Sequence, residues 1–427
     1  MFRKTNRPWC RPATVAAGRF VRFASRVTKH GGSALPGKVV EKIDPGFLTR
    51  TLGQLPLGVV LVSGTNGKTT TTRMVASMLS DLGLKVFTNP TGSNFVRGVV
   101  SALLTEVTLG GKLDADIAVL ELDEAYAVHF VKQVKPRYAL LLNVMRDQLD
   151  RFGEIDTTAK LLSHVAAATT GTVVLNREDP RIAALAAKAP AGTTVRYFGL
   201  ADDLRRYFPS DDDMAVSVEG VAGPLPSART PLSPRSELRG ASAGTAELPA
   251  DVTLTAVGDH KATFQMDGQG YATDVKLEGV YNLYNAAAAL AVVRAVMQDN
   301  AAASKATAAA NACAVSADEL IAAVSRVTPA FGRGEVIDVN GSPVELLLVK
   351  NPMGFRLSLA NADTMIAIND EYADGRDMSW LWDVDFTSLR ASGVAMVSGV
   401  RAWDMALRLG YDQVPVADTD RRASCRE

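Results

Sequence analysis

The sequence is poor in the residues that stabilise small secreted proteins and zinc-binding domains. Only three of its 427 residues are cysteine (Cys10, Cys313 and Cys425); they lie far apart, and no Cys-x-x-Cys pair occurs. This spacing argues against a disulfide framework and against a zinc site built from four cysteines. The cysteine content therefore indicates a protein of a reducing compartment.

Two further classes of protein are disfavoured by what the chain lacks. No apolar run approaches the roughly 18 residues that a bilayer-spanning helix needs. Lys and Arg total 46 and Asp and Glu total 46, so the formal net charge is zero, whereas a protein that coats nucleic acid carries a broad cationic surplus. We therefore expect no transmembrane segment and no nucleic-acid partner.

Length and composition favour a multidomain globular protein. A chain of 427 residues, of which 47% are hydrophobic, is too long for one compact core and suggests two or three domains. We expect a basic arm at residues 1–38, a central domain at 39–328 and a C-terminal domain at 329–427. An insertion is expected at about 206–250, because residues 224–244 are rich in Pro, Ser and Gly.

The N-terminal arm concentrates positive charge. Residues 1–38 contain nine Lys and Arg residues and no acidic residue. Within the arm, Val15, Phe20, Phe23 and Val27 recur near a helical period, with arginines between them. This pattern is typical of a helix that lies on an anionic membrane surface. A solvated, frayed terminus and an Arg-rich import peptide are the alternatives.

Apolar runs alternate with helix-length segments, which predicts an α/β fold with a parallel sheet covered by helices on both faces. In the first half, strands are predicted at residues 58–63, 117–122, 138–143 and 171–176, and a helix at 68–82. In the second half, strands are predicted at 252–254 and 262–265, and helices at 284–296 and 301–315. A smaller C-terminal α/β domain has predicted strands at 344–349, 364–368 and 393–397.

The strongest chemical signal is the run Gly64-Thr65-Asn66-Gly67-Lys68-Thr69-Thr70, between a predicted strand and a predicted helix. Glycines let backbone N–H groups approach phosphate closely at a helix N-terminus. Lys68 is predicted to neutralise the β- and γ-phosphates, and the Thr69 hydroxyl to help hold Mg²⁺. Val62 stands where the general P-loop motif has its first glycine, so the motif matches only in its second half. We predict nucleotide binding.

Glu121 is the second candidate, because it lies at the carboxyl end of the predicted strand 117–122. The carboxyl ends of the strands in an open parallel sheet line the ligand crevice. Nucleotide-bound Mg²⁺ is usually held by one or two carboxylates and by phosphate oxygens. We therefore predict that Glu121 binds Mg²⁺. The alternative is a solvated acidic turn in which Asp123 and Glu124 are ordinary helix-start residues.

These motifs resemble those of the Mur ligases, which build peptidoglycan stem peptides. The resemblance rests on residues 64–70, the strand of Glu121, and residues 146–154, 279–286 and 332–333. Within the Mur ligases, residues 349–354 and 369–380 resemble the MurT family of synthetase subunits. The match runs from about residue 35 to about residue 409. It implies a central P-loop domain with a mostly parallel sheet and a smaller, Rossmann-like C-terminal domain that is shortened at its end.

The resemblance implies an ATP-dependent amidation. ATP phosphorylates the α-carboxylate of D-glutamate in the stem peptide of lipid II, and ammonia then displaces phosphate to leave D-isoglutamine. Because two anions meet, Lys68, Arg333 and Mg²⁺ are expected as counter-charges. Asn285 resembles the family asparagine on the adenine side of ATP. The implied location is the bacterial cytoplasm, peripheral to the inner face of the plasma membrane.

The ammonia is expected to come from a second protein. A glutaminase needs a cysteine nucleophile activated by histidine, and none of the four histidines stands in a cysteine context. The resemblance implies a separate glutaminase of the GatD type that forms a heterodimer with this chain. It also implies that Asp377 completes the Cys–His pair of that glutaminase. The alternative is that residues 369–380 form a solvated acidic loop.

Several positions depart from the family pattern. Gln148 stands where other Mur ligases have a histidine that helps bind a second metal, which leaves Asp147 or Asp150 for that role. Lys160 lies near the carbamylated lysine of many Mur ligases, but at a shorter spacing, so no role is assigned to it. Residues 224–244 lack the cysteines of the zinc ribbon that some relatives insert, so we expect no zinc.

Two other functions stay open at this point. Folylpolyglutamate synthases and other amino-acid-adding ligases of the Mur type generally carry Asp-x-Ala-His-Asn-Pro in the third domain. This chain has Leu-Leu-Val-Lys-Asn-Pro at residues 347–352. The non-enzyme alternative is a scaffold that binds ATP without chemistry, and Lys68, Glu121 and Arg333 argue against it.

Overall fold

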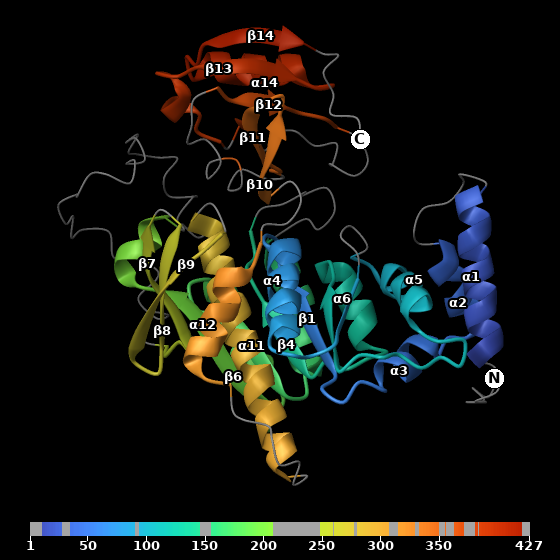
Figure 1. Cartoon of the computed structure of the whole chain (residues 1–427). Helices are drawn as coiled ribbons and strands as arrows, with labels where there is room; N and C mark the ends of the chain where they lie inside the picture. The colour runs from blue at the N-terminus through green and yellow to red at the C-terminus, as the bar shows by residue number, and fades with distance from the viewer. Residues whose placement is uncertain are drawn as a thin grey trace.

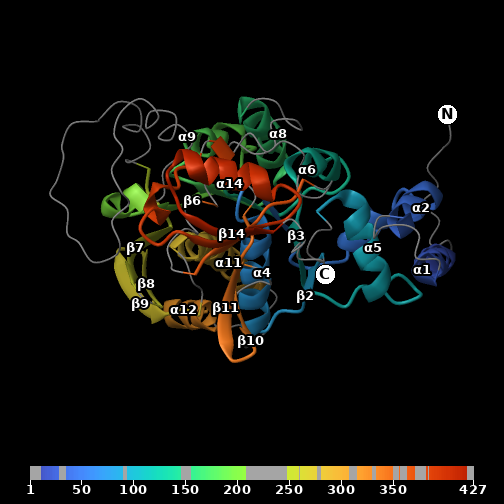
Figure 2. The same cartoon turned by 90° about the horizontal axis from the view of Figure 1, so that it is seen from above.

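A central α/β body and a smaller C-terminal part make up the protein in the computed structural model (Figure 1). The C-terminal strands lie above the central sheet in Figure 1, and over its middle when seen from above in Figure 2. The structure describes residues 11–27, 35–89, 94–145, 155–207, 248–258, 260–276, 280–306, 315–328, 333–349, 355, 363–370, 381–382 and 384–420.

A nine-stranded sheet forms the central body, in the order β2-β3-β1-β4-β5-β6-β7-β8-β9. Strands β1 to β7 pair in parallel, and β7, β8 and β9 pair antiparallel. The mostly parallel sheet predicted from the sequence is confirmed. Its strands are β1 (Val59–Ser63), β2 (Val86–Thr88), β3 (Ile117–Glu121), β4 (Tyr138–Leu141), β5 (Thr172–Asn176), β6 (Thr194–Leu200), β7 (Val252–Gly258), β8 (Lys261–Met266) and β9 (Gln269–Asp274).

Helices cover both faces of this sheet because its strands are apolar on both sides. In β1, Val60 and Val62 belong to one hydrophobic core, whereas Val59 and Leu61 belong to the core on the other face. The first core includes α4 (Lys68–Asp81), α11 (Val280–Ala306) and α12 (Ala317–Arg326). The second includes α3 (Phe47–Leu52), α5 (Val96–Glu106), α6 (Glu124–Val131), α8 (Ile155–Ala168) and α9 (Pro180–Ala183). Short 3₁₀ segments are η2 (Ala184–Lys188) and η3 (Asp202–Tyr207).

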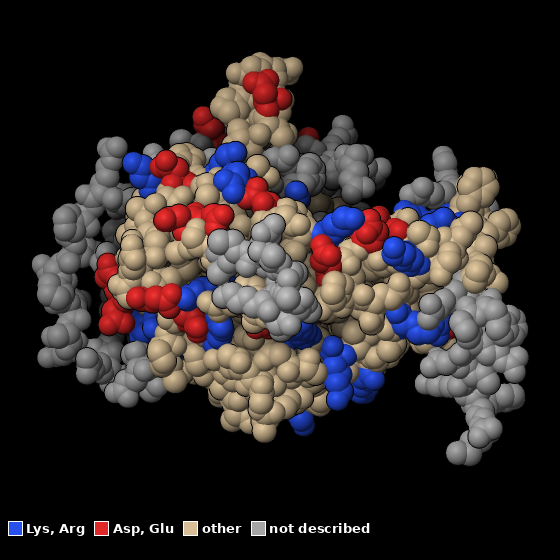
Figure 3. Space-filling model, turned by 60° about the horizontal axis from the view of Figure 1, so that its bottom comes forward, with Lys and Arg blue, Asp and Glu red and all other residues tan. Residues whose placement is uncertain are grey.

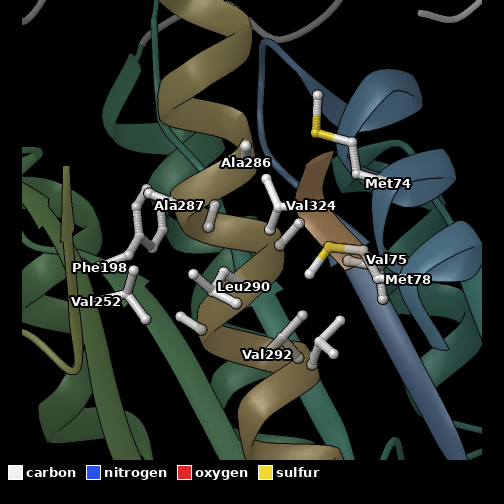
Figure 4. Packing of buried hydrophobic residues seen from close by; sticks show 14 of the residues in the cluster. Met74, Val75, Met78, Phe198, Val252, Ala286, Ala287, Leu290, Val292 and Val324 are labelled. Atoms are coloured by element: carbon white, nitrogen blue, oxygen red, sulfur yellow. The ribbon is translucent and has the colours of Figure 1, made fainter. Parts of the chain in front are cut away.

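Helix α11 fills the middle of the first core. Its residues Ala286, Ala287 and Leu290 are at most 1% exposed, and Figure 4 shows α11 between Met74 and Met78 of α4 on one side and Phe198 and Val252 on the other. The small alanine side chains let the helix backbone approach its neighbours closely.

Two helix predictions in this region need correction. The predicted helix 284–296 extends in both directions, and residues 301–306 continue it instead of starting a second helix. Residues 307–314 lie outside the described part of the chain. Helix α12 was not predicted, although Ser316 and Glu319 form a capping box at its start, which is a recognisable sequence signal.

The N-terminal segment folds against the body as a helical pair, α1 (Arg11–Val27) and α2 (Leu35–Ile43). Both lie beside α5 at one end of the molecule (Figures 1 and 2). A Cβ added to Gly37 would lie 2.1 Å from the Arg97 carbonyl oxygen, so α2 approaches the backbone of α5. The Arg19 Nε donates to the Leu104 carbonyl oxygen at 2.9 Å. The frayed-terminus alternative is therefore wrong for residues 11–27.

The predicted apolar stripe on α1 is wrong at one position, Val15. Val15 is 0% exposed, whereas Phe20 and Phe23 are 70% and 66% exposed. Phe20 is five positions after Val15, which places them well apart around a helix. Among the described residues, no helix is long and apolar enough to cross a bilayer.

The C-terminal part contains a parallel sheet and a hairpin. Strands β12 (Met365–Ala367), β13 (Val394–Ser398) and β14 (Val416–Asp420) form the sheet, and α14 (Ala402–Tyr411) packs on it over Phe386 and Phe355. The 3₁₀ segment η5 (Thr387–Leu389) precedes β13. This arrangement confirms the smaller α/β domain.

One predicted strand of this domain, 344–349, belongs elsewhere. It forms β11 (Ser342–Leu347), which pairs antiparallel with β10 (Arg333–Val339) in a separate hairpin. Asn340 and Gly341 at its turn both have positive φ, 55° and 86°. Asn-Gly is the preferred pair for such a turn, so the sequence carried a signal for this hairpin.

Candidate functional site

The loop between β1 and α4 has the shape of a phosphate cradle. Gly64 and Gly67 have φ values of 136° and 81°, which favour glycine. A Cβ added to Gly67 would lie 2.6 Å from the Asn285 Oδ1, and one added to Gly64 would lie 3.0 Å from the Asn143 nitrogen. Both glycines therefore let Asn285 and Asn143 approach the backbone of the loop closely. Thr70, in the first turn of α4, is buried.

Asn143, which follows β4, holds this loop in shape. Its carbonyl oxygen accepts from the Thr65 N–H at 2.9 Å, and its Oδ1 accepts from the Asn66 N–H at 2.8 Å. Its Nδ2 donates to the Asn66 carbonyl oxygen at 3.1 Å and to the Tyr281 hydroxyl at 3.2 Å. Sequence reasoning missed Asn143, although it ends a predicted strand just as Glu121 does.

Lys68, the first residue of α4, lies beside a buried carboxylate. Its Nζ donates to Glu124 Oε1 and to the Thr65 carbonyl oxygen, each at 3.2 Å. The Lys68 and Glu124 side chains are 13% and 3% exposed. Burial raises the pKa of Glu124 above its usual value, and the charge of Lys68 opposes that rise. Glu124 is therefore more than the ordinary helix-start residue of the solvated-turn alternative.

Thr69 and Glu121 bring two side-chain oxygens together, at the start of α4 and the end of β3. The Thr69 hydroxyl donates to Glu121 Oε1 at 2.9 Å. The Asn89 side chain holds the backbone of Glu121, accepting from its N–H at 2.9 Å and donating to its carbonyl oxygen at 3.0 Å. Glu121 is 6% exposed, which contradicts the solvated-turn alternative.

The residues present fit a magnesium nucleotide. A hard cation such as Mg²⁺ takes oxygen ligands, and Thr69 and Glu121 supply a hydroxyl and a carboxylate in contact. Glycine N–H groups and the Lys68 ammonium stand at the N-terminus of α4, where phosphate binds favourably. The arrangement can therefore hold the phosphates of a nucleotide and one divalent cation.

A further buried carboxylate, Asp179, supports the segment behind the loop. Asp179 Oδ2 accepts from the Val144 N–H at 2.7 Å. Its Oδ1 caps α9 by accepting from the N–H groups of Arg181 and Ile182 at 2.9 and 3.1 Å. Burial raises the pKa of Asp179. Asp179 thus ties α9 to the residue that follows Asn143.

The remaining predicted residues are placed only in part. Asn285 lies in α11 with its amide against Gly67. Arg333 is the first residue of β10. Lys160, to which no role was assigned, is exposed on α8.

Other predicted positions lie outside the described residues. They are Asp377, the three cysteines, and the second-metal candidates Asp147, Gln148 and Asp150. Their roles, and the expectation that the chain binds no zinc, stay predictions.

Two known domain families match the chain. The Mur ligase middle domain matches residues 62–222, which contain the loop, Glu121 and Asn143. The MurT ligase C-terminal domain matches residues 348–427. The two matches lie in the order that the sequence resemblance implied.

Curated relatives and solved structures agree with these matches. The chain is 30% identical to the lipid II isoglutaminyl synthase (glutamine-hydrolyzing) subunit MurT of Streptococcus pneumoniae, over 94% of this chain and 88% of the relative. It is 27% identical to the subunit of the same name from Staphylococcus aureus, over 93% and 87%. The solved MurF ligase of Thermotoga maritima in complex with ADP shares the fold, with a TM-score of 0.57 and 17% identity, over 90% of this chain and 74% of that structure. The chain belongs to the MurT family of Mur ligases.

Proposed function

We propose that this chain is the synthetase subunit of a lipid II isoglutaminyl synthase. It uses ATP to convert the D-glutamate α-carboxylate of the lipid II stem peptide to the amide of D-isoglutamine. The two MurT relatives carry this activity in their names. The observation that carries the proposal is the phosphate loop with Lys68 at its end and the Thr69–Glu121 oxygen pair beside it.

Different residues of the site bind different parts of the magnesium–ATP complex. The N–H groups of the loop and the Lys68 ammonium bind the phosphates. Thr69 and Glu121 hold Mg²⁺, which neutralises phosphate charge when bound. Asn285 and Arg333 complete the nucleotide site from α11 and from the start of β10. Lys68 must turn from Glu124 toward the phosphates when the nucleotide enters.

The reaction has two steps, both displacements. An oxygen of the substrate carboxylate attacks the γ-phosphorus, the bond to the β–γ bridging oxygen breaks, and ADP leaves. Ammonia then attacks the carbonyl carbon of the acyl phosphate, phosphate leaves, and the nitrogen loses a proton. The first step brings two anions together, so positioning and charge neutralisation are what the chain must supply.

A partner supplies the ammonia in this proposal. The names of the relatives describe a subunit of a glutamine-hydrolysing enzyme, and we assign the hydrolysis to a GatD-type glutaminase bound as a heterodimer. Asp377 completes the Cys–His pair of that partner by orienting its histidine. The complex works in the cytoplasm, where ATP and glutamine are available.

The test is amidation by the purified chain with lipid II, ATP, Mg²⁺, ammonium salt and a mixture of free amino acids. The expected product shows the acid-to-amide mass change by mass spectrometry, with one ADP formed for each amide. Addition of a whole amino acid to the substrate would overturn the proposal in favour of a folylpolyglutamate synthase-like ligase. Nucleotide binding without any product would favour the scaffold.

A further inference from the structure

Helix α1 exposes a continuous apolar stripe to solvent. Its members follow a spacing of three and four residues, so they lie on one side of the helix. All of them are exposed, and the three large ones, Phe20, Phe23 and Val27, are 70%, 66% and 67% exposed. The α1 stripe consists of Ala13, Ala16, Phe20, Phe23 and Val27.

The opposite side of α1 is fixed to the protein. Thr14 and Val15 are at most 1% exposed. The Thr14 hydroxyl donates to Asp44 Oδ2 at 3.2 Å. The Arg19 Nη2 donates to the Val107 carbonyl oxygen at 2.6 Å, at the C-terminal end of α5. These contacts fix the orientation of α1 about its own axis, so the stripe faces away from the body.

This arrangement reverses the usual pattern of a surface helix. Surface helices normally turn apolar residues inward and polar residues outward. Adjacent exposed Phe and Val side chains mark an interaction site. We therefore expect the stripe to bind another molecule or a surface.

The basic charge of the N-terminal segment indicates what the stripe binds. Helix α1 contains four arginines and no acidic residue, and one of them, Arg19, donates to backbone carbonyl oxygens at the C-terminal end of α5. Residues 1–38 as a whole contain nine basic residues and no acidic one. On the face shown in Figure 3, Lys and Arg gather toward the end of the molecule that carries α1 in Figure 1, whereas Asp and Glu are more frequent toward the other end.

A second copy of α1 is the less suitable occupant. The three-and-four spacing would let two such helices pair along their stripes. Pairing would bring together two helices that each contain four arginines and no acidic residue. Like charges across a helix pair disfavour that arrangement. An anionic surface instead attracts the arginines while its apolar interior accepts the phenylalanines.

We propose that the α1 stripe docks this protein on an anionic lipid surface, with Phe20, Phe23 and Val27 inserted at the boundary between headgroups and acyl chains. The docking goes beyond the amidation proposed above. It would place the enzyme on the surface that carries a lipid-linked substrate.

The test is sedimentation of the full chain with vesicles of equimolar phosphatidylglycerol and phosphatidylcholine. The variant is Phe20→Ala with Phe23→Ala, in which alanine preserves helix propensity. The matched control is Trp403→Ala with Leu407→Ala, which removes two side chains on α14 that are 65% and 58% exposed. Neutral phosphatidylcholine vesicles form the second arm.

We expect the wild type and the α14 control to bind anionic vesicles and the α1 variant to partition at least about tenfold more weakly. Binding to neutral vesicles should be weak for all three proteins, and added salt should weaken binding to anionic ones. Equal partition of the α1 variant, or equal wild-type binding to neutral vesicles, would overturn the proposal. A dimer that only the α1 variant loses, measured by light scattering, would assign the stripe to a second copy.

Two controls separate this inference from folding and from the proposed function. The α1 variant should keep the thermal midpoint of the wild type, because both phenylalanines are exposed; if it does not, Val27→Ala alone replaces it in the same assay. Amidation of detergent-dispersed lipid II should be unchanged in the α1 variant, whereas amidation of vesicle-embedded lipid II should fall. Vesicle binding without any amidation would reject the proposed function and leave the docking intact.

Discussion

The Lys68 ammonium lies 3.2 Å from the Glu124 carboxylate, and both side chains are largely buried. The two residues are 56 positions apart in the chain. An unpaired charge in such a place is costly, so each compensates the other. Incoming phosphate must therefore compete with Glu124 for the Lys68 ammonium, so the charge on Glu124 affects the affinity for ATP.

Lys68→Ala and Glu121→Ala should each abolish measurable amidation while the fold is retained. Removal of a group that neutralises phosphate or holds its metal should cost on the order of 10²–10³ in rate. The measurement is ADP release and amide formation with free ammonium as the nitrogen source. Lys160→Ala, an exposed lysine on α8, is the control and should act normally. Near-normal turnover by either site variant would refute the assignment.

Glu124→Gln should make ATP binding tighter and less dependent on pH. Burial raises the pKa of Glu124, so its carboxyl stays protonated to a higher pH than that of an ordinary glutamate. As the pH rises through that raised pKa, ionised Glu124 holds Lys68 more strongly and wild-type affinity for ATP should fall relative to the variant, by about tenfold at most. Calorimetric titrations of both proteins across pH 5–8 provide the measurement, because ionisation of ATP itself is common to both. Parallel pH profiles would contradict the prediction.

Asn143→Ala should destabilise the loop itself, and thereby lower protein stability and weaken ATP binding. It removes the bonds that the side chain makes to the backbone of Asn66 and to Tyr281. Leaving these partners unpaired should lower the free energy of unfolding by about 2–3 kcal/mol, with weaker ATP binding. Denaturant unfolding and calorimetry measure the two effects. Asn143→Asp keeps the acceptor for the Asn66 N–H and loses the donor, so its unfolding free energy should lie between those of the wild type and the alanine variant.

Asp179→Ala should lower the free energy of unfolding while leaving the amidation rate close to normal. Its carboxylate accepts from three backbone N–H groups, of Val144, Arg181 and Ile182. Loss of a helix cap together with a buried acceptor should cost about 2–4 kcal/mol. Thermal unfolding measures the loss, and amidation at a temperature well below the new midpoint should be close to normal. An unchanged midpoint would show that water replaces the carboxylate.

Asp377→Asn should separate the two nitrogen sources. The variant removes the negative charge with little change of shape, so a histidine in the glutaminase would lose its orienting group. We expect glutamine-dependent amidation to fall in the complex, while ammonium-dependent amidation and ATP binding persist. Equal loss with both nitrogen sources would place Asp377 in the synthetase site or the fold, and no loss would make it a surface acid.

The sequence by itself determined the features that depend on neighbouring residues. An apolar run, a glycine-rich turn and a helix starting at Lys68 follow one another directly, so β1, the loop and α4 could be predicted in place. The position of Glu121 at a strand end followed from the same local pattern, because parallel strands present their carboxyl ends at one edge.

The tertiary structure alone decided which distant residues meet. Asn143 and Asn66 lie 77 positions apart, and nothing local in the chain pairs Lys68 with Glu124 or sets Asn285 against Gly67. Helical periodicity placed Phe20, Phe23 and Val27 on one side of α1 and Val15 well away from them, but periodicity shows which residues share a face and not which face the protein covers. Burial by α2 and α5 settled that choice, since it removed Val15 from water and left the phenylalanines exposed.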